Sequence, residues 1–114
     1  MKYPFAADLI FAQAETATEM LKALANPQRL RILCLLIEGE LTVGQINAQV
    51  PLSQSALSQH LAILRTKALV STRKSAQTVF YRVADGPVQQ IIQTLHDLYC
   101  STEGNDNAIR KRCD

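Results

Sequence analysis

The stretch LSQSALSQHLAILRTKA, residues 52–68, decides the fold of this 114-residue chain. Ser53 is a residue type that begins helices, because its hydroxyl accepts a hydrogen bond from a backbone N–H of the first turn. We expect a helix from Gln54 to about Lys67, which at about 100° per residue separates into two faces. The face predicted to point into the core carries Leu57, Leu61, Leu64 and Ala68.

The opposite face of this helix is uncharged near its start and rich in hydrogen-bonding groups. It carries Gln54, Ser55, Ser58, Gln59, Ala62 and Arg65. Gln can pair with an adenine edge through two hydrogen bonds, and Ser can reach bases or phosphates. An ordinary solvated face of this length usually carries Asp or Glu. The pattern therefore predicts a helix that reads DNA in the major groove.

Three helices are expected before this one. The alanine-rich segment 5–24 has apolar residues at roughly helical spacing, and Asn26-Pro27 ends it. A second helix is predicted from Pro27 to Glu38, with an apolar stripe at Leu30, Leu33, Cys34 and Ile37. Thr42 followed by Gln45 is typical of a capping box, which predicts a short helix to about Gln49.

Two β-rich runs and a last helix follow. Residues 69–74 and 78–83 flank a short polar link at 75–77, a pattern that predicts a hairpin. Gly86-Pro87 begins the last helix, whose apolar stripe is Val88, Ile91, Ile92, Leu95 and Tyr99. The order α-α-α-α-β-β-α predicts a mainly α fold with one β-hairpin, a winged helix-turn-helix spanning 1–100. Residues 101–114 are polar and aperiodic, and we expect a disordered tail.

The charge distribution favours a polyanionic partner. Net charge is only +2, but residues 41–84 contain no Asp or Glu and hold five cations, Arg65, Lys67, Arg73, Lys74 and Arg82. Cations and Gln77 around the hairpin tip would reach phosphates or the minor groove. The residues predicted to contact double-stranded DNA are Thr42, Gln54, Ser55, Ser58, Gln59, Arg65, Arg73, Lys74 and Gln77.

Membrane, secretory and enzymatic roles find little support. No apolar run approaches the ~20 residues of a membrane span. Asp8 interrupts the apolar start that a secretory signal would need, so we expect a cytoplasmic protein. Ser58 and His60 lie two residues apart on a helix and point in different directions, so we expect no catalytic residues and no cofactor.

Three motifs together resemble the ArsR family of winged-helix repressors. They are residues 24–33 (LANPQRLRIL), 52–61 (LSQSALSQHL) and 77–81 (QTVFY). The resemblance covers about residues 21–100. It implies a homodimer built on the first and last helices and an inverted-repeat operator. Ala68 and Ala76 depart from it, since the family often has Gly at both places.

Two metal sites known in this family are not matched. The cysteine-containing motif of one corresponds here to residues 40–44 (ELTVG), which have no thiol. The other, on the last helix, keeps only Asp85, with Pro87, Leu98 and Ser101 at its remaining positions. One carboxylate does not hold a selective transition metal, so we expect no metal ligands.

Cys34 and Cys100 resemble the cysteines of the persulfide- and redox-sensing branch of the family, the BigR-like and HlyU-like regulators. That resemblance implies an intrasubunit disulfide or polysulfide bridge between them. The alternative for Cys34 is a small core hydrophobe, because it lies on an apolar stripe. Cys100 lies at a stripe's edge, where access is easier, and His96 one turn earlier would influence its ionisation, although a helix C-terminus disfavours a thiolate. Cys113 in the tail is interpreted as incidental.

These features predict a sequence-specific regulator, a repressor released from DNA when an oxidant or reactive sulfur species bridges Cys34 and Cys100. Some relatives act as antirepressors, so the sign of the effect stays open. One alternative is a metal- or haem-responsive regulator using Cys34, Cys100, His96 or the tail. Another is a thiol redox enzyme, which the lack of a CxxC pair opposes. A third is a protein-interaction module with a degenerate helix-turn-helix.

Overall fold

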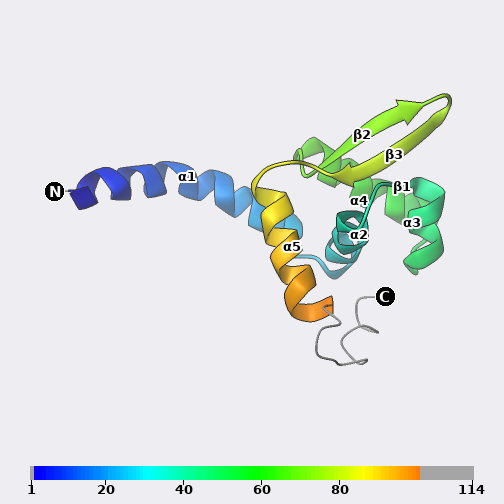
Figure 1. Ribbon diagram of the computed structural model, residues 1–114, viewed down its shortest axis with the longest axis horizontal. Helices are drawn as coiled ribbons and strands as arrows, with labels where there is room; N and C mark the ends of the chain where they lie inside the picture. Colours follow the sequence, from blue (N-terminus) through cyan, green and yellow to red (C-terminus); the bar gives the residue numbers. More distant parts are fainter. Residues whose placement is uncertain (1, 101–114) are drawn as a thin grey trace.

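The computed structural model describes residues 2–100, and their side chains from residue 8 onward. In chain order, the elements are α1 (Lys2–Leu24), α2 (Pro27–Ile37), β1 (Leu41–Thr42), α3 (Val43–Gln49), α4 (Gln54–Thr66), β2 (Val70–Ser75), β3 (Thr78–Val83) and α5 (Pro87–Cys100). Figure 1 shows α1 projecting away from a body made of the other helices and the hairpin. The predicted winged helix-turn-helix is confirmed. The predicted tail at 101–114 lies outside the described residues.

The core lies where α2, α4 and α5 meet the sheet. Its largest fully buried side chains are Ile32, Leu33, Ile46, Leu57, Leu64 and Ile92. The stripe predicted for α2 was only partly right. Leu33 is buried, but Cys34 is half-buried, whereas Ile32 and Leu36 are buried. The reason is that α2 is covered from several sides, by α1, α4, α5 and β3, and not along one stripe.

The sheet has one strand more than the predicted hairpin. Its order is β1-β3-β2, and both pairings are antiparallel. Leu41 pairs with Tyr81 and Thr42 with Phe80, so β1 joins the segment after α2 to the wing. A strand of two residues has no alternating pattern, which explains why the sequence did not predict it.

Two alanines adopt backbone angles that favour glycine. Ala68 and Ala76 both have φ of 59°. Ala68 follows α4, where Leu69 N–H donates to Leu64 O at 2.8 Å and Ala68 N–H to Arg65 O at 3.0 Å, the pattern of a Schellman motif. The prediction that Ala68 faces the core was wrong. The helix ends at Thr66, and the left-handed residue leaves its side chain exposed.

Replacing either alanine by glycine should stabilise the fold. Ala68→Gly and Ala76→Gly should each raise the free energy of unfolding by about 0.5–1 kcal/mol, because a Cβ is disfavoured at positive φ by about 1–2 kcal/mol and glycine's extra unfolded-state entropy offsets only part of that. Thermal unfolding followed by circular dichroism measures the effect. The control is Ala62→Gly inside α4, which should destabilise by about 1 kcal/mol. Loss of stability in Ala68→Gly would contradict the prediction.

Within residues 2–100, none of the helices is long and apolar enough to cross a membrane.

Candidate nucleic-acid interface and thiol pair

The exposed face of α4 is organised as its sequence predicts. The Ser53 hydroxyl accepts from Ala56 N–H at 3.1 Å and fixes the first turn of the helix. Leu57, Leu61 and Leu64 are buried on the inner side. All six residues predicted for the outer side are exposed, namely Gln54, Ser55, Ser58, Gln59, Ala62 and Arg65. A helix held by three leucines thus presents amide, hydroxyl and guanidinium groups to solvent.

Thr42 lies apart from this face, at the start of α3. Its hydroxyl accepts from Gln45 N–H at 3.1 Å, and the Gln45 side chain accepts from Thr42 N–H at 2.9 Å. The predicted capping box is therefore confirmed. The half-buried Thr42 also pairs with Phe80 in the sheet, so one residue fixes α3 relative to the wing. Its contact with DNA stays a prediction.

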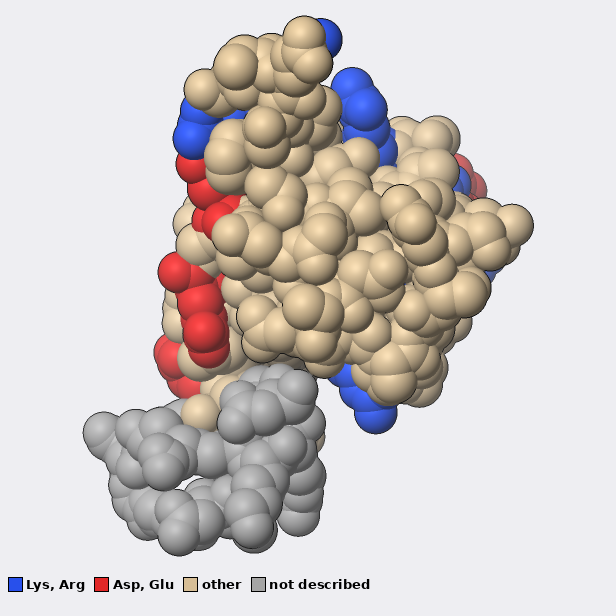
Figure 2. Space-filling model, turned by 90° about the vertical axis from the view of Figure 1, so that its right-hand side faces the viewer, with Lys and Arg blue, Asp and Glu red and all other residues tan. Residues whose placement is uncertain are grey.

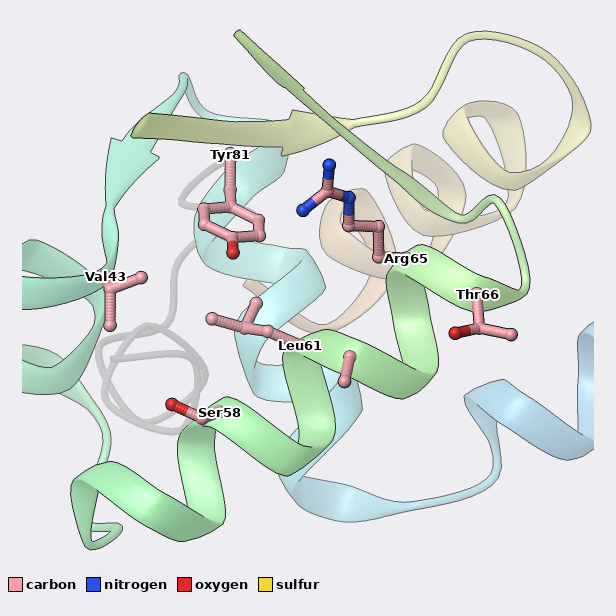
Figure 3. Close-up of a pocket in the computed structure, with 7 residues that line it drawn as sticks. Val43, Ser58, Leu61, Arg65, Thr66 and Tyr81 are labelled. Carbon is pink, nitrogen blue, oxygen red and sulfur yellow. The ribbon is translucent and has the colours of Figure 1, made fainter. Parts of the chain in front are cut away.

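A hollow of about 360 Å³ separates α4 from β3 and α3. Figure 3 shows Arg65 reaching from α4 toward the strands, and Tyr81 reaching from β3 toward α4. Ser58 and Val43 line the same hollow. Tyr81 was not among the residues predicted from the sequence to form a site. Its place in the QTVFY motif was the available signal, but only the pairing of β1 with β3 brings it beside α4.

The wing cations have different surroundings. Arg73 forms an ion pair with Glu40, with two Nε contacts of 2.9 and 3.0 Å and an Nη2 contact of 2.5 Å. Its guanidinium also lies over the Phe80 ring, 4.5 Å from the centroid. Lys74 and Gln77 are exposed, and Lys74 forms no ion pair with any residue between 2 and 100. Lys74 thus presents the wing's uncompensated charge near the tip.

Figure 2 looks onto the end of the molecule that carries α3 and the hairpin tip. The acidic side chains in view lie at its margins, and its broad middle carries none. The face is therefore poor in acids and not strongly basic. A surface of this kind avoids repelling phosphates while leaving recognition to hydrogen-bonding groups.

The two cysteines of interest lie on helices that pack together, α2 and α5. Cys34 is a free, half-buried thiol, and Cys100 is buried. The expectation that Cys100 is the more accessible of the two was wrong, since Cys100 is only 9% exposed and Cys34 is half-buried. Burial raises the pKa of the Cys34 thiol, and the nearby Glu38 carboxylate raises it further.

Contacts between α2 and α5 indicate how the cysteines align. His96 Nε2 lies 2.8 Å from Glu38 Oε2. A hollow nearby is lined by Gly39 and Glu40 beyond α2 and by Gln89 near the start of α5. Later residues of one segment thus meet earlier residues of the other, as in an antiparallel pair. Cys34 is one turn before Glu38 and Cys100 one turn after His96, so antiparallel packing predicts that the two lie at the same level.

Among residues 2–100, no group of three or more His, Cys, Asp or Glu side chains is arranged to hold a metal ion. Asp85, the remaining match to a family metal site, is exposed and accepts from Arg82 Nη2 at 2.8 Å.

The raised pKa of Cys34 makes its reactivity measurable against pH. In a Cys100→Ser/Cys113→Ser protein, alkylation of Cys34 by iodoacetamide should be slow at pH 7 and still rise above pH 9, because the thiolate is the reacting form. Glu38→Gln should speed the reaction at pH 7, since it removes one cause of the shift. Mass spectrometry of timed samples gives the rates.

Glu40→Gln is the matched control, because Glu40 carries the same charge two residues away but does not contribute to the Cys34 shift. Equal acceleration by both variants, or a rate that reaches its plateau below pH 8, would contradict the assignment.

Comparison with known proteins gives three findings. The family model described as bacterial regulatory protein, arsR family, matches residues 26–72. The transcriptional activator HlyU of Vibrio cholerae is 56% identical over 84 residues, which cover 74% of this chain and 78% of that protein. The crystal structure of the transcriptional repressor BigR from Xylella fastidiosa superposes with a TM-score of 0.78 at 32% identity, covering 88% of this chain and 99% of that one.

A further solved structure bears on assembly. A possible ArsR-family regulator of Mycobacterium bovis, solved as a homodimeric winged helix-turn-helix DNA-binding domain, matches with a TM-score of 0.68 at 30% identity. The match covers 76% of this chain and 81% of that one.

Proposed function

This chain belongs to the ArsR family of bacterial regulators, and from that premise we propose that it is a homodimeric repressor that leaves its operator when Cys34 and Cys100 become bridged. As a family member it is a DNA-binding transcriptional regulator and not an enzyme. The operator, the homodimer and the thiol switch are proposals that go beyond family membership.

The observation that carries the DNA-binding assignment is the exposed polar face of α4. Side chains that pair with base edges lie along one side of a rigid, capped helix. Lys74 and Gln77 at the wing tip would contact phosphates or the minor groove beside it. Arg65 and Tyr81 border the hollow between these two elements.

The dimer is supported by uncovered apolar surface. On α1, the consecutive residues Leu9, Ile10 and Phe11 are all exposed, and Phe11 is 72% exposed. On α5, a hollow lined by Pro87, Ile91 and Leu95 opens to solvent, and Leu98 next to it is 64% exposed. A second copy of the chain would cover both helices, as the homodimeric relative suggests.

The thiol switch is supported by the alignment of α2 with α5. A bridge between Cys34 and Cys100 would tie a helix of the core to a helix of the proposed dimer interface. The two α4 helices of a dimer would then lose the spacing that two half-sites require. We propose repression, although the relatives include both an activator and a repressor by name.

Selection from a random duplex library tests the DNA-binding proposal. The reduced protein should select near-palindromic sites with half-site centres about 10 bp, or a multiple, apart. Gln54→Ala should relax the selected sequence, because it removes a base contact. Lys74→Ala should weaken binding to every duplex. It should also lower the slope of log affinity against log salt by about 0.9 for each phosphate that the lysine neutralises in the parent complex.

Lys22→Ala is the matched control, since Lys22 is an exposed lysine on α1 that lies beside Glu19 and away from the wing. Its slope should equal that of the parent. If Lys74→Ala also kept the parental slope and affinity, the wing assignment would be wrong; selection of no sequence at all would overturn the DNA-reading role.

A further inference from the structure

Two acidic residues flank Gly39 in the turn after α2, and each is bound to a different part of the molecule. Glu38 contacts His96 of α5 at 2.8 Å. Glu40 contacts Arg73 of β2. The helix pair that holds the cysteines and the wing proposed to contact DNA are therefore both bound to one three-residue turn.

The Glu40–Arg73 contact is the stronger link. The carboxylate accepts from two nitrogens of the guanidinium, and the Phe80 ring packs against the same group. Such bidentate pairs hold a fixed geometry. Arg73 holds the pKa of Glu40 below its ordinary value, and Glu40 raises the pKa of Arg73, so both stay charged at neutral pH. The pair thus joins Glu40 directly to β2, beside the backbone pairing of β2 with β3.

The Glu38–His96 contact is more enclosed than a typical surface pair. The His96 side chain is only 18% exposed. Its Nδ1 is buried, has no hydrogen-bond partner within the described part of the chain, and lies 3.9 Å from an Asp97 oxygen. The ring is therefore held through Nε2, and a shift of α5 along α2 would pull on Glu38.

The turn between the two acids is short. Gly39 has φ of +155°, a value that other residues rarely adopt. The Cα atoms of residues two apart are separated by at most about 7 Å, so the two acids cannot move independently over larger distances. The pairing of Leu41 with Tyr81 extends the same connection into the sheet.

We propose that the Glu38–Gly39–Glu40 turn couples the α2–α5 pair to the wing. In this coupling Glu38 contacts α5 through His96, and Glu40 positions β2 through Arg73. Glu40 and His96 act in this proposal as positioning residues for DNA binding. The inference rests on the proposed function for the event that shifts α5, but the link itself is present while Cys34 is a free thiol, and it is tested without the Cys34–Cys100 bridge.

A double-mutant cycle between His96 and Glu40 tests the link. No contact joins these two side chains among the described residues, and independent sites are additive to within about twofold in affinity. Affinity of reduced protein for a duplex selected by the parent is measured by fluorescence anisotropy. We expect His96→Asn to weaken binding at least about fivefold, and less than about twofold when Glu40→Gln is already present.

Asp85→Asn provides the matched background, because it removes another ion pair of the wing region, Arg82–Asp85, and leaves both acids of the turn in place. There His96→Asn should keep its full effect. Additive effects of His96→Asn and Glu40→Gln on affinity would overturn the proposal. Equal non-additivity of His96→Asn with Asp85→Asn and with Glu40→Gln would also overturn it.

Hydrogen exchange of the β2 and β3 amides gives a readout that needs no DNA. His96→Asn should speed amide exchange in the wing when it is made in the parent protein, but not when Glu40→Gln is already present. If His96→Asn folds poorly, Glu38→Gln takes its place. Unchanged exchange in both variants would overturn the coupling. If the thiol switch fails, the result of the double-mutant cycle does not change. That failure is measured separately, as DNA binding that is unaltered after the cysteines are bridged.

Discussion

A polysulfide donor added to the reduced protein is expected to link Cys34 to Cys100 within one subunit and to weaken DNA binding about 5–150-fold, the range of typical coupling energies. The physical reason is that the contacts between α2 and α5 are those of an antiparallel pair, in which each cysteine is one turn from the Glu38–His96 contact and on the same side of it. A disulfide requires Cα atoms at about 4.4–6.8 Å, and a polysulfide spans somewhat more. Closing the bridge would fix α2 against α5.

Single-cysteine variants separate this mechanism from general oxidation damage. Cys34→Ser and Cys100→Ser should each stay bound to DNA after treatment, because one thiol alone cannot join two helices. Cys113→Ser is the control and should respond like the parent. Peptide mapping of the treated protein, beside a fluorescence-anisotropy titration, measures both bridge and affinity. Full loss of binding in either serine variant, or a dominant bridge through Cys113, would exclude the proposed switch.

Strong periodicity made the central helix predictable. Its three leucines recur at helical spacing and Ser53 marks its start. Its polar side is exposed, so no other element packs against that side and alters the simple two-faced pattern. The hairpin was equally visible, because two β-rich runs flank a two-residue turn at 76–77. Local sequence was sufficient where local hydrogen bonds and one buried face decide the structure.

Tertiary contacts explain what the sequence did not predict. Glu40 and Arg73 are 33 positions apart, and only the pairing of β1 with β3 brings the turn after α2 beside β2. The buried face of α2 was misjudged for a similar reason, since several elements cover this helix. Ala68 was misplaced because nothing in the local sequence marks an alanine that adopts a left-handed conformation after α4. Its correspondence to a position where the family often has glycine was the one available signal.

Leu98→Glu is expected to have the other large effect, converting the proposed dimer into monomers. Leu98 continues the stripe of Pro87, Ile91 and Leu95 on α5 and is exposed in the single chain. A charge there would leave the core intact but oppose burial against a second copy. Without the second half-site, binding to a palindromic duplex should weaken about 10²–10⁴-fold, with half-site affinity unchanged.

The matched control for this variant lies on the same helix. Gln93 is about 140° away from Leu98 around α5, and its amide donates to Asp97, so Gln93→Lys changes charge without touching the stripe. It should remain dimeric by light scattering at micromolar concentration. If Leu98→Glu also remained dimeric with full affinity, the interface would lie elsewhere. If the parent bound its palindrome as a monomer, two-fold recognition would be excluded, and a bridge that reorients subunits would have nothing to act on.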